Sequence, residues 1–115
     1  MVMRAPIPTN EHERLDALLE LDVLDTPADE RLDEIVGLAA DLCGAPMAAL
    51  SLVDSHRQWF KSHRGMPRTQ TPRDGSFCAH TIMSESVMVV RDATTDARFF
   101  DSPLVTDEGF RFYAG

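Results

Sequence analysis

A cysteine and a histidine stand two positions apart at Cys78 and His80, directly after a loop rich in Pro, Thr and Arg. A thiol near an imidazole can act as a nucleophile, because the imidazole takes the thiol proton. Two positions on a helix span roughly 200°, so these side chains are expected to face apart. A catalytic pair would then need His56 or His63 brought in from another element. The other interpretation is structural: Cys78 is a small buried hydrophobe and His80 a hydrogen-bonded, partly buried side chain. We therefore expect no catalytic residue.

The spacing of the same residues does not favour a metal site. Structural zinc sites use pairs of close ligands such as C-x₂-C or H-x₃-H. Here Cys78 and His80 form C-x-H, and His56 and His63 lie seven positions apart. Cys43 and Cys78 alone make no disulfide framework. We expect no metal, and reduced thiols in a cytoplasmic protein.

Charge is distributed unevenly along the 115 residues, a length typical of one domain. Residues 1–46 carry eleven Asp and Glu against three Arg, whereas residues 47–115 carry eight acids and eight bases. Five bases with no acid among them lie between Asp54 and Asp74, namely Arg57, Lys61, Arg64, Arg68 and Arg73. This basic stretch either complements the acidic part within the molecule or is simply a solvated face; the functional alternative is that it meets an anionic ligand or partner.

The net charge of −8 argues against nucleic-acid binding, because neutralising phosphates requires a net basic face. No run of 18 apolar residues is present, so no membrane-spanning segment is expected. We therefore expect neither nucleic acid nor membrane as a partner.

Two amphipathic helices are predicted in the acidic part. Asn10 and Glu13 have the spacing of a capping box, which begins a first helix that ends near Val23. Thr26 and Pro27 are typical of an N-cap and a first helical residue, and the second helix ends at the following Gly-Ala-Pro. The stripes expected to be buried are Leu15, Leu18 and Leu19 in the first helix, and Leu32, Ile35, Val36, Ala39 and Leu42 in the second.

Strand patterns follow. The apolar run at 47–54 and the alternating run at 57–65 predict a β-hairpin, and two prolines predict a loop over 65–74. Asp74 or Ser76 then caps a short helix that ends near Ser84.

The last third of the chain completes the prediction. A third strand is predicted over 87–93 and a fourth over 111–115, with one helical turn around 97–100 in the irregular segment between them. Helices followed by antiparallel strands predict an α+β fold, with helices packed on a sheet.

Five stretches carry a resemblance to a known family: LDTPADERLDEIVGLAADL (24–42), AALSLVDSHRQWFKSHRGM (48–66), TPRDGSFCAHTI (71–82), VVRDATTDARFFDSPLVT (89–106) and RFYAG (111–115). They resemble one branch of the GAF family, sensory domains found mostly at the front of bacterial signalling proteins such as diguanylate cyclases and histidine kinases. The combination of RQWFK, SFCAH and RFYAG in this order is specific. The similarity covers about residues 11–115, and residues 1–10 are expected to be a flexible segment.

The resemblance implies an antiparallel sheet with helices on both sides and a small-ligand pocket under the loops and the short helix. The implied pocket residues are Trp59, Ser76, Phe77, Cys78, His80, Asp92, Arg98, Phe99 and Phe112. It also implies a non-catalytic sensory module that controls an output domain absent from this chain. The alternative is a thiol-based redox sensor or a GAF-fold redox enzyme that uses Cys78.

The residues name no cofactor or ligand. The Asn-Lys-Phe-Asp-Glu signature of cyclic-nucleotide-binding members is absent, and Ala79 separates the Cys and His that bilin-binding relatives often have side by side. Family members also continue past RFYAG with a strand that pairs beside the first strand. We therefore expect a sheet that is incomplete at the C-terminus, and a homodimer formed through the N-terminal helices or the open sheet edge.

Overall fold

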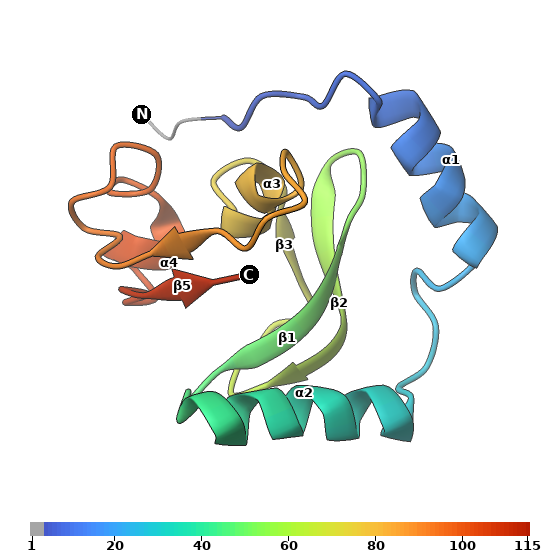
Figure 1. Cartoon of the computed structure of the whole chain (residues 1–115), viewed down its shortest axis with the longest axis horizontal. Helices are drawn as coiled ribbons and strands as arrows, with labels where there is room; N and C mark the ends of the chain where they lie inside the picture. Colours follow the sequence, from blue (N-terminus) through green and yellow to red (C-terminus); the bar gives the residue numbers. More distant parts are fainter. Residues whose placement is uncertain (1–3) are drawn as a thin grey trace.

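Two helices precede a three-stranded sheet in the chain, and two short helices and a smaller two-stranded sheet complete the fold (Figure 1). The computed structural model describes residues 4–115. Its elements are α1 (Glu11–Leu21), α2 (Glu30–Cys43), β1 (Ala48–Val53), β2 (Arg57–Arg64), β3 (Gln70–Pro72), α3 (Phe77–Thr81), β4 (Val89–Val90), α4 (Pro103–Thr106) and β5 (Tyr113–Ala114). This is the predicted α+β fold.

The first sheet lies between helices, as expected. Its strands are antiparallel in the order β1-β2-β3. On one face α2 is bound to β2, where Ser62 donates to Asp33 at 2.6 Å. On the other face the Cys78 thiol of α3 lies 3.2 Å from the Ser51 hydroxyl of β1. Figure 1 shows α2 and α3 on opposite sides of the β1–β2 ribbon.

The face that α2 buries differs from the predicted stripe. Val36 and Ala40 are buried, whereas Ile35, Leu38 and Leu42 are 57–78% exposed. Hydrogen bonds to β2 determine which side of α2 faces the sheet. Ser62 and Arg64 of β2 bind the side that carries Asp33, the Gly37 carbonyl and Asp41. In α1 only Leu18 of the predicted stripe is buried, and Leu19 is 70% exposed.

The first predicted helix start is confirmed in position, and the second needs correction. Asn10 stands at the N-cap of α1, but its side chain makes no capping hydrogen bond. The cap of α2 is Asp29, whose carboxylate accepts from the N–H groups of Arg31 and Leu32. Thr26 instead donates to the Val23 carbonyl at 2.5 Å. The prediction of a helix start there was wrong because a better cap follows three residues later.

The predicted loop over 65–74 contains a strand that the sequence did not indicate. The three residues of β3 pair with Arg57–Trp59 of β2, with Pro72 opposite Arg57. Proline is tolerated here because β3 is an edge strand.

The later elements are shorter than predicted, and one was missed. The helix α3 ends at Thr81, and β4 and β5 have two residues each. The helical turn expected around 97–100 is confirmed by the bond from the Phe100 N–H to the Asp96 carbonyl. The missed helix is α4, which Ser102 caps by accepting from the Leu104 N–H.

The second sheet pairs β4 with β5 and surrounds its own core. Val89 pairs with Ala114 and Val90 with Tyr113. The buried cluster at this end consists of Phe77, Val90, Ala93, Phe99 and Val105. The two sheets are separate, and the expectation that a strand beyond residue 115 joins them stays a prediction.

Three bases of the basic stretch form ion pairs within the molecule. Arg57 pairs with Asp25 at 2.7 Å, Arg64 with Asp41 at 2.8 Å and Arg73 with Glu11 at 2.5 Å. All three acids belong to the acidic N-terminal part. The interpretation as an intramolecular complement is therefore confirmed.

Candidate functional site at helix α3

The helix α3 begins at a buried serine. The Ser76 hydroxyl accepts from the Ala79 N–H at 3.2 Å and donates to the Arg73 carbonyl at 2.7 Å. Ser76 is 1% exposed, so its position depends entirely on these protein partners. Asp74 and Ser76 were the predicted candidates for the cap, and Ser76 is the cap in the structure.

Aromatic rings fill the space beneath α3. The Phe77 ring lies 4.5 Å from that of Phe99 and stacks on Tyr113 at 4.8 Å between ring centroids. Phe110 stacks on the other side of the cluster at 6.1 Å. Phe77 and Phe99 are 3% and 0% exposed, so they form packed core.

The Cys78 thiol lies among hydroxyl groups. Its sulfur is 3.2 Å from the Ser51 hydroxyl and 3.4 Å from the Tyr113 hydroxyl, which in turn contacts Thr81 at 2.8 Å. Burial raises the pKa of Tyr113 well above its usual value, and the nearby thiol adds to the shift. Tyr113 is therefore a neutral hydroxyl. These partners hold the thiol without supplying a base.

His80 faces away from Cys78, as the helical spacing predicted. Its ring meets the Phe99 ring edge-on, with 5.0 Å between centroids. Burial lowers the pKa of His80 and the nearby Arg98 lowers it further, so the imidazole is neutral near pH 7. Its Nε2 atom is buried and has no hydrogen-bond partner among the described residues.

Arg98 covers the other side of the same ring. Its guanidinium carbon lies 5.0 Å from the Phe99 ring centroid, and its Nη2 pairs with Asp96 at 2.8 Å. A hydrogen bond from Arg98 lowers the pKa of Asp96. The guanidinium also contacts the Met88 sulfur at 3.3 Å. The Arg98 charge thus lies close enough to His80 to lower the pKa of its imidazole.

Three predicted pocket residues lie elsewhere. Asp92 is exposed and accepts from the N–H of Thr94, and Phe112 is 63% exposed. Trp59 lies on the α2 face of the sheet, in a hollow of about 500 Å³ that also contains Thr26 and Asp33. The residues that the structure brings together are Ser76, Phe77, Cys78, His80, Arg98 and Phe99.

The sequence analysis missed Ser51, Thr81 and Tyr113 as members of this group. Tyr113 had a usable signal, because adjacent strand residues point to opposite faces and Phe112 was assigned inward in its place. Ser51 comes from β1, 27 positions before Cys78, and no local pattern links it to α3.

A smaller hollow of about 260 Å³ lies at the end of α3. It is lined by Pro8, Thr9, Asn10, Ile82, Met83, Ser84 and Glu85. The N-terminal segment thus passes beside α3, and Arg4 pairs with Asp74 at 3.2 Å. The flexibility expected of residues 1–10 stays a prediction, and residues 1–3 lie outside the described part.

Residues 4–115 show neither a metal-binding cluster nor a membrane-spanning helix. That range contains no group of three His, Cys, Asp or Glu placed to hold a metal ion. Within it, no helix has the length and apolar character needed to cross a membrane.

Residues 27–115 match the family model of the GAF domain. The chain belongs to the GAF domain family. It is also 43% identical over 111 residues to a cyclic di-GMP phosphodiesterase of Pseudomonas aeruginosa. That match covers 96% of this chain but only 19% of the relative's length. The GAF resemblance is confirmed, while the branch associated with cyclases and kinases stays a prediction because this relative is a phosphodiesterase.

Proposed function

We propose that this GAF domain is a non-catalytic regulatory module that binds a small molecule beside α3 and controls an output domain in a signalling protein. The observation that carries the proposal is the Nε2 atom of His80, which is buried and unpartnered among the described residues. Buried polar atoms normally have a hydrogen-bond partner, so a ligand group is a reasonable candidate for this one. By analogy with the phosphodiesterase relative, the output we propose is turnover of cyclic di-GMP.

The chemistry around His80 limits the ligand. A neutral imidazole nitrogen can donate or accept one hydrogen bond. The Arg98 guanidinium beside it favours an oxygen-bearing or anionic group, although Asp96 already neutralises part of that charge. We propose a small polar molecule that places one such group between His80 and Arg98.

We also propose that the chain forms a cytoplasmic homodimer, through α1 or through the open sheet edge, with neither nucleic acid nor membrane as a partner. The strand β1 has β2 on one side only, and its other edge has no partner strand among residues 4–115. Leu19 and Leu21 of α1 are 70% and 67% exposed. A second copy would cover either surface symmetrically.

Native mass spectrometry of the purified chain tests both proposals. We expect a dimer of the 12.8 kDa chain with a retained small molecule. His80→Ala should lose the added mass and keep the dimer, whereas His56→Ala, at an exposed histidine on the β1–β2 turn, should retain both. A monomer would contradict the dimer. A missing added mass, or one that survives His80→Ala, would contradict the ligand site.

Thiol-based redox sensing is a second candidate function. The observation that favours it is the position of Cys78, whose sulfur contacts Ser51 of the first sheet and Tyr113 of the second. Oxidation would replace a weak hydrogen-bonding group with a larger polar one at this junction. A reactive cysteine usually lies in an electropositive environment, and the hydroxyl partners of Cys78 do not provide one.

Cys78→Ser separates the two candidates. The serine hydroxyl can keep the contacts to Ser51 and Tyr113, so we expect an intact fold and a loss of about 1 kcal/mol in the free energy of unfolding. Urea denaturation measures this, and native mass spectrometry should show the same retained molecule. If the substitution abolishes an activity or a peroxide response of the wild-type chain, Cys78 is functional and the redox candidate is favoured over a purely non-catalytic module.

A further inference from the structure

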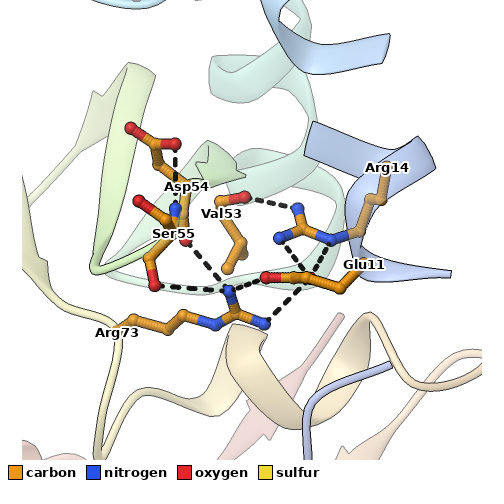
Figure 2. A network of polar contacts seen from close by, with 6 residues as sticks. All are labelled: Glu11, Arg14, Val53, Asp54, Ser55 and Arg73. Carbon is orange, nitrogen blue, oxygen red and sulfur yellow. Dashed lines mark hydrogen bonds and ion pairs between the residues drawn. The ribbon is translucent and has the colours of Figure 1, made fainter. Parts of the chain in front are cut away.

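Arg73 is a buried cation in the link between β3 and α3. Its side chain is 5% exposed and pairs with Glu11, 62 positions earlier in the first turn of α1. Figure 2 shows its guanidinium between that carboxylate and the β1–β2 turn, where Nη1 also donates to the Asp54 carbonyl at 3.2 Å. A buried charge is tolerated only when it is paired and hydrogen-bonded, so Arg73 and Glu11 must stay together.

The backbone of the same residue begins α3. The Arg73 carbonyl accepts from both the N–H and the hydroxyl of Ser76, at 3.1 and 2.7 Å. Ser76 in turn caps α3 through the Ala79 N–H. The Arg73 N–H donates to the His56 carbonyl at 3.0 Å. One residue therefore connects the start of α3, the β1–β2 turn and the start of α1.

The attachment of α1 is concentrated at its first turn. Glu11 also pairs with Arg14 at 2.7 Å, and Arg14 donates to the Val53 carbonyl of β1 (Figure 2). Further along the helix Leu18 is buried, but Leu19 and Leu21 are largely exposed. Figure 1 shows α1 at the periphery of the molecule, apart from α2. The direction of α1 therefore depends on the ion pairs of its first turn.

We propose that Arg73 couples α3 to α1, so that a displacement of the α3 cap shifts Glu11 and with it the whole of α1. This coupling would connect the proposed ligand region at α3 to the N-terminal helix α1. It rests on the proposed function only for the direction in which a signal would travel. If α3 moved without α1, the buried guanidinium would lose its carboxylate, which is unfavourable. The coupling itself exists without a ligand and can be tested without one.

Hydrogen exchange on the full chain is the test, with two variants that perturb opposite ends. Glu11→Gln removes the charge on α1, and Ser76→Ala removes the cap of α3. Coupling is reciprocal, so each variant should speed amide exchange in the helix that it does not touch, by about fivefold or more. We expect faster exchange at Phe77–Thr81 in Glu11→Gln and at Glu11–Leu21 in Ser76→Ala, with β1 and β2 unchanged.

Two control variants match these changes. Glu13→Gln removes an exposed acid from the same first turn of α1, and Asp29→Ala removes the cap of α2. Neither should change exchange in α3. If Ser76→Ala does not fold, Arg73→Lys, which keeps the charge but loses the guanidinium fork, takes its place and should speed exchange in both helices. Faster exchange only in the substituted helix would overturn the proposal, and so would a uniform increase that includes β1 and β2. Failure of ligand retention with preserved coupling would count against the proposed function alone.

Discussion

Phe99→Ala should lower the free energy of unfolding by about 3–5 kcal/mol, the range for removing a buried aromatic side chain. The Phe99 ring is fully buried, and it contacts the rings of Phe77 and His80 and the guanidinium of Arg98. Its loss would leave a cavity between α3 and the β4–β5 sheet, which is joined to α3 through this cluster. Urea denaturation followed by tyrosine and tryptophan fluorescence measures the loss.

Phe100→Ala is the matched control, because the neighbouring ring is 54% exposed. Exposed substitutions usually change stability by no more than about 0.5 kcal/mol. Phe99→Leu should lie between the two, since leucine fills part of the cavity. Equal effects at positions 99 and 100 would show that the ring cluster does not hold the second sheet in place.

Most elements followed from local signals, whereas β3, α4 and the orientation of the helices did not. Caps and turn residues act within a few positions, which is why Ser76 and the Gly44 end of α2 were predicted. The buried side of α2 depends on where Ser62 and Arg64 of β2 lie, and a strand after the helix leaves no mark on the helix sequence. Its exposed Ile35 and Leu42 therefore appeared to be core.

The fold places Trp59 away from the predicted pocket residues on α3, and the pocket role that the resemblance implies for it stays a prediction. The register between β1 and β2 shifts after Leu50, where Leu50 pairs with Ser62 and Ser51 with Phe60, leaving Lys61 as an extra residue. A bulge of one residue changes which side chains share a face. Ser51 points to α3, and Trp59, opposite the next residue of β1, points to α2. The alternation of the sequence contains no sign of this bulge.

The contacts that define the candidate site are mostly between residues distant in sequence. Cys78 and His80 were found from their own segment, because their types and helical spacing suggest opposite faces. Tyr113 and Ser51 approach Cys78 only after both sheets have formed. The sequence alone identified α3 as the segment with chemically interesting side chains. The hydroxyl groups that contact the Cys78 thiol could be identified only from the fold.

The second large effect is expected at Glu11. Glu11→Ala should lower the free energy of unfolding by about 3 kcal/mol, because it leaves the buried Arg73 cation without its carboxylate. Glu13→Ala is the control: it removes an exposed acid from the same turn of α1, so a change within about 0.5 kcal/mol is expected. Urea denaturation at pH 7 measures both. Because the pair between Arg73 and Glu11 is buried, added salt should change the difference in unfolding free energy between wild type and Glu11→Ala only little.

The pH dependence of this difference provides an independent test. Hydrogen bonding from Arg73 holds the pKa of Glu11 below its usual value. A carboxyl group whose folded pKa is lowered stabilises the protein fully above its unfolded pKa of about 4.3, and it loses that contribution as the pH falls through the folded pKa. The gap between wild type and Glu11→Ala should therefore be constant from neutral pH down to about pH 5 and narrow below it. A gap that stays constant through the acid range would mean that the Glu11 charge is not what holds α1, and that its loss acts through packing alone.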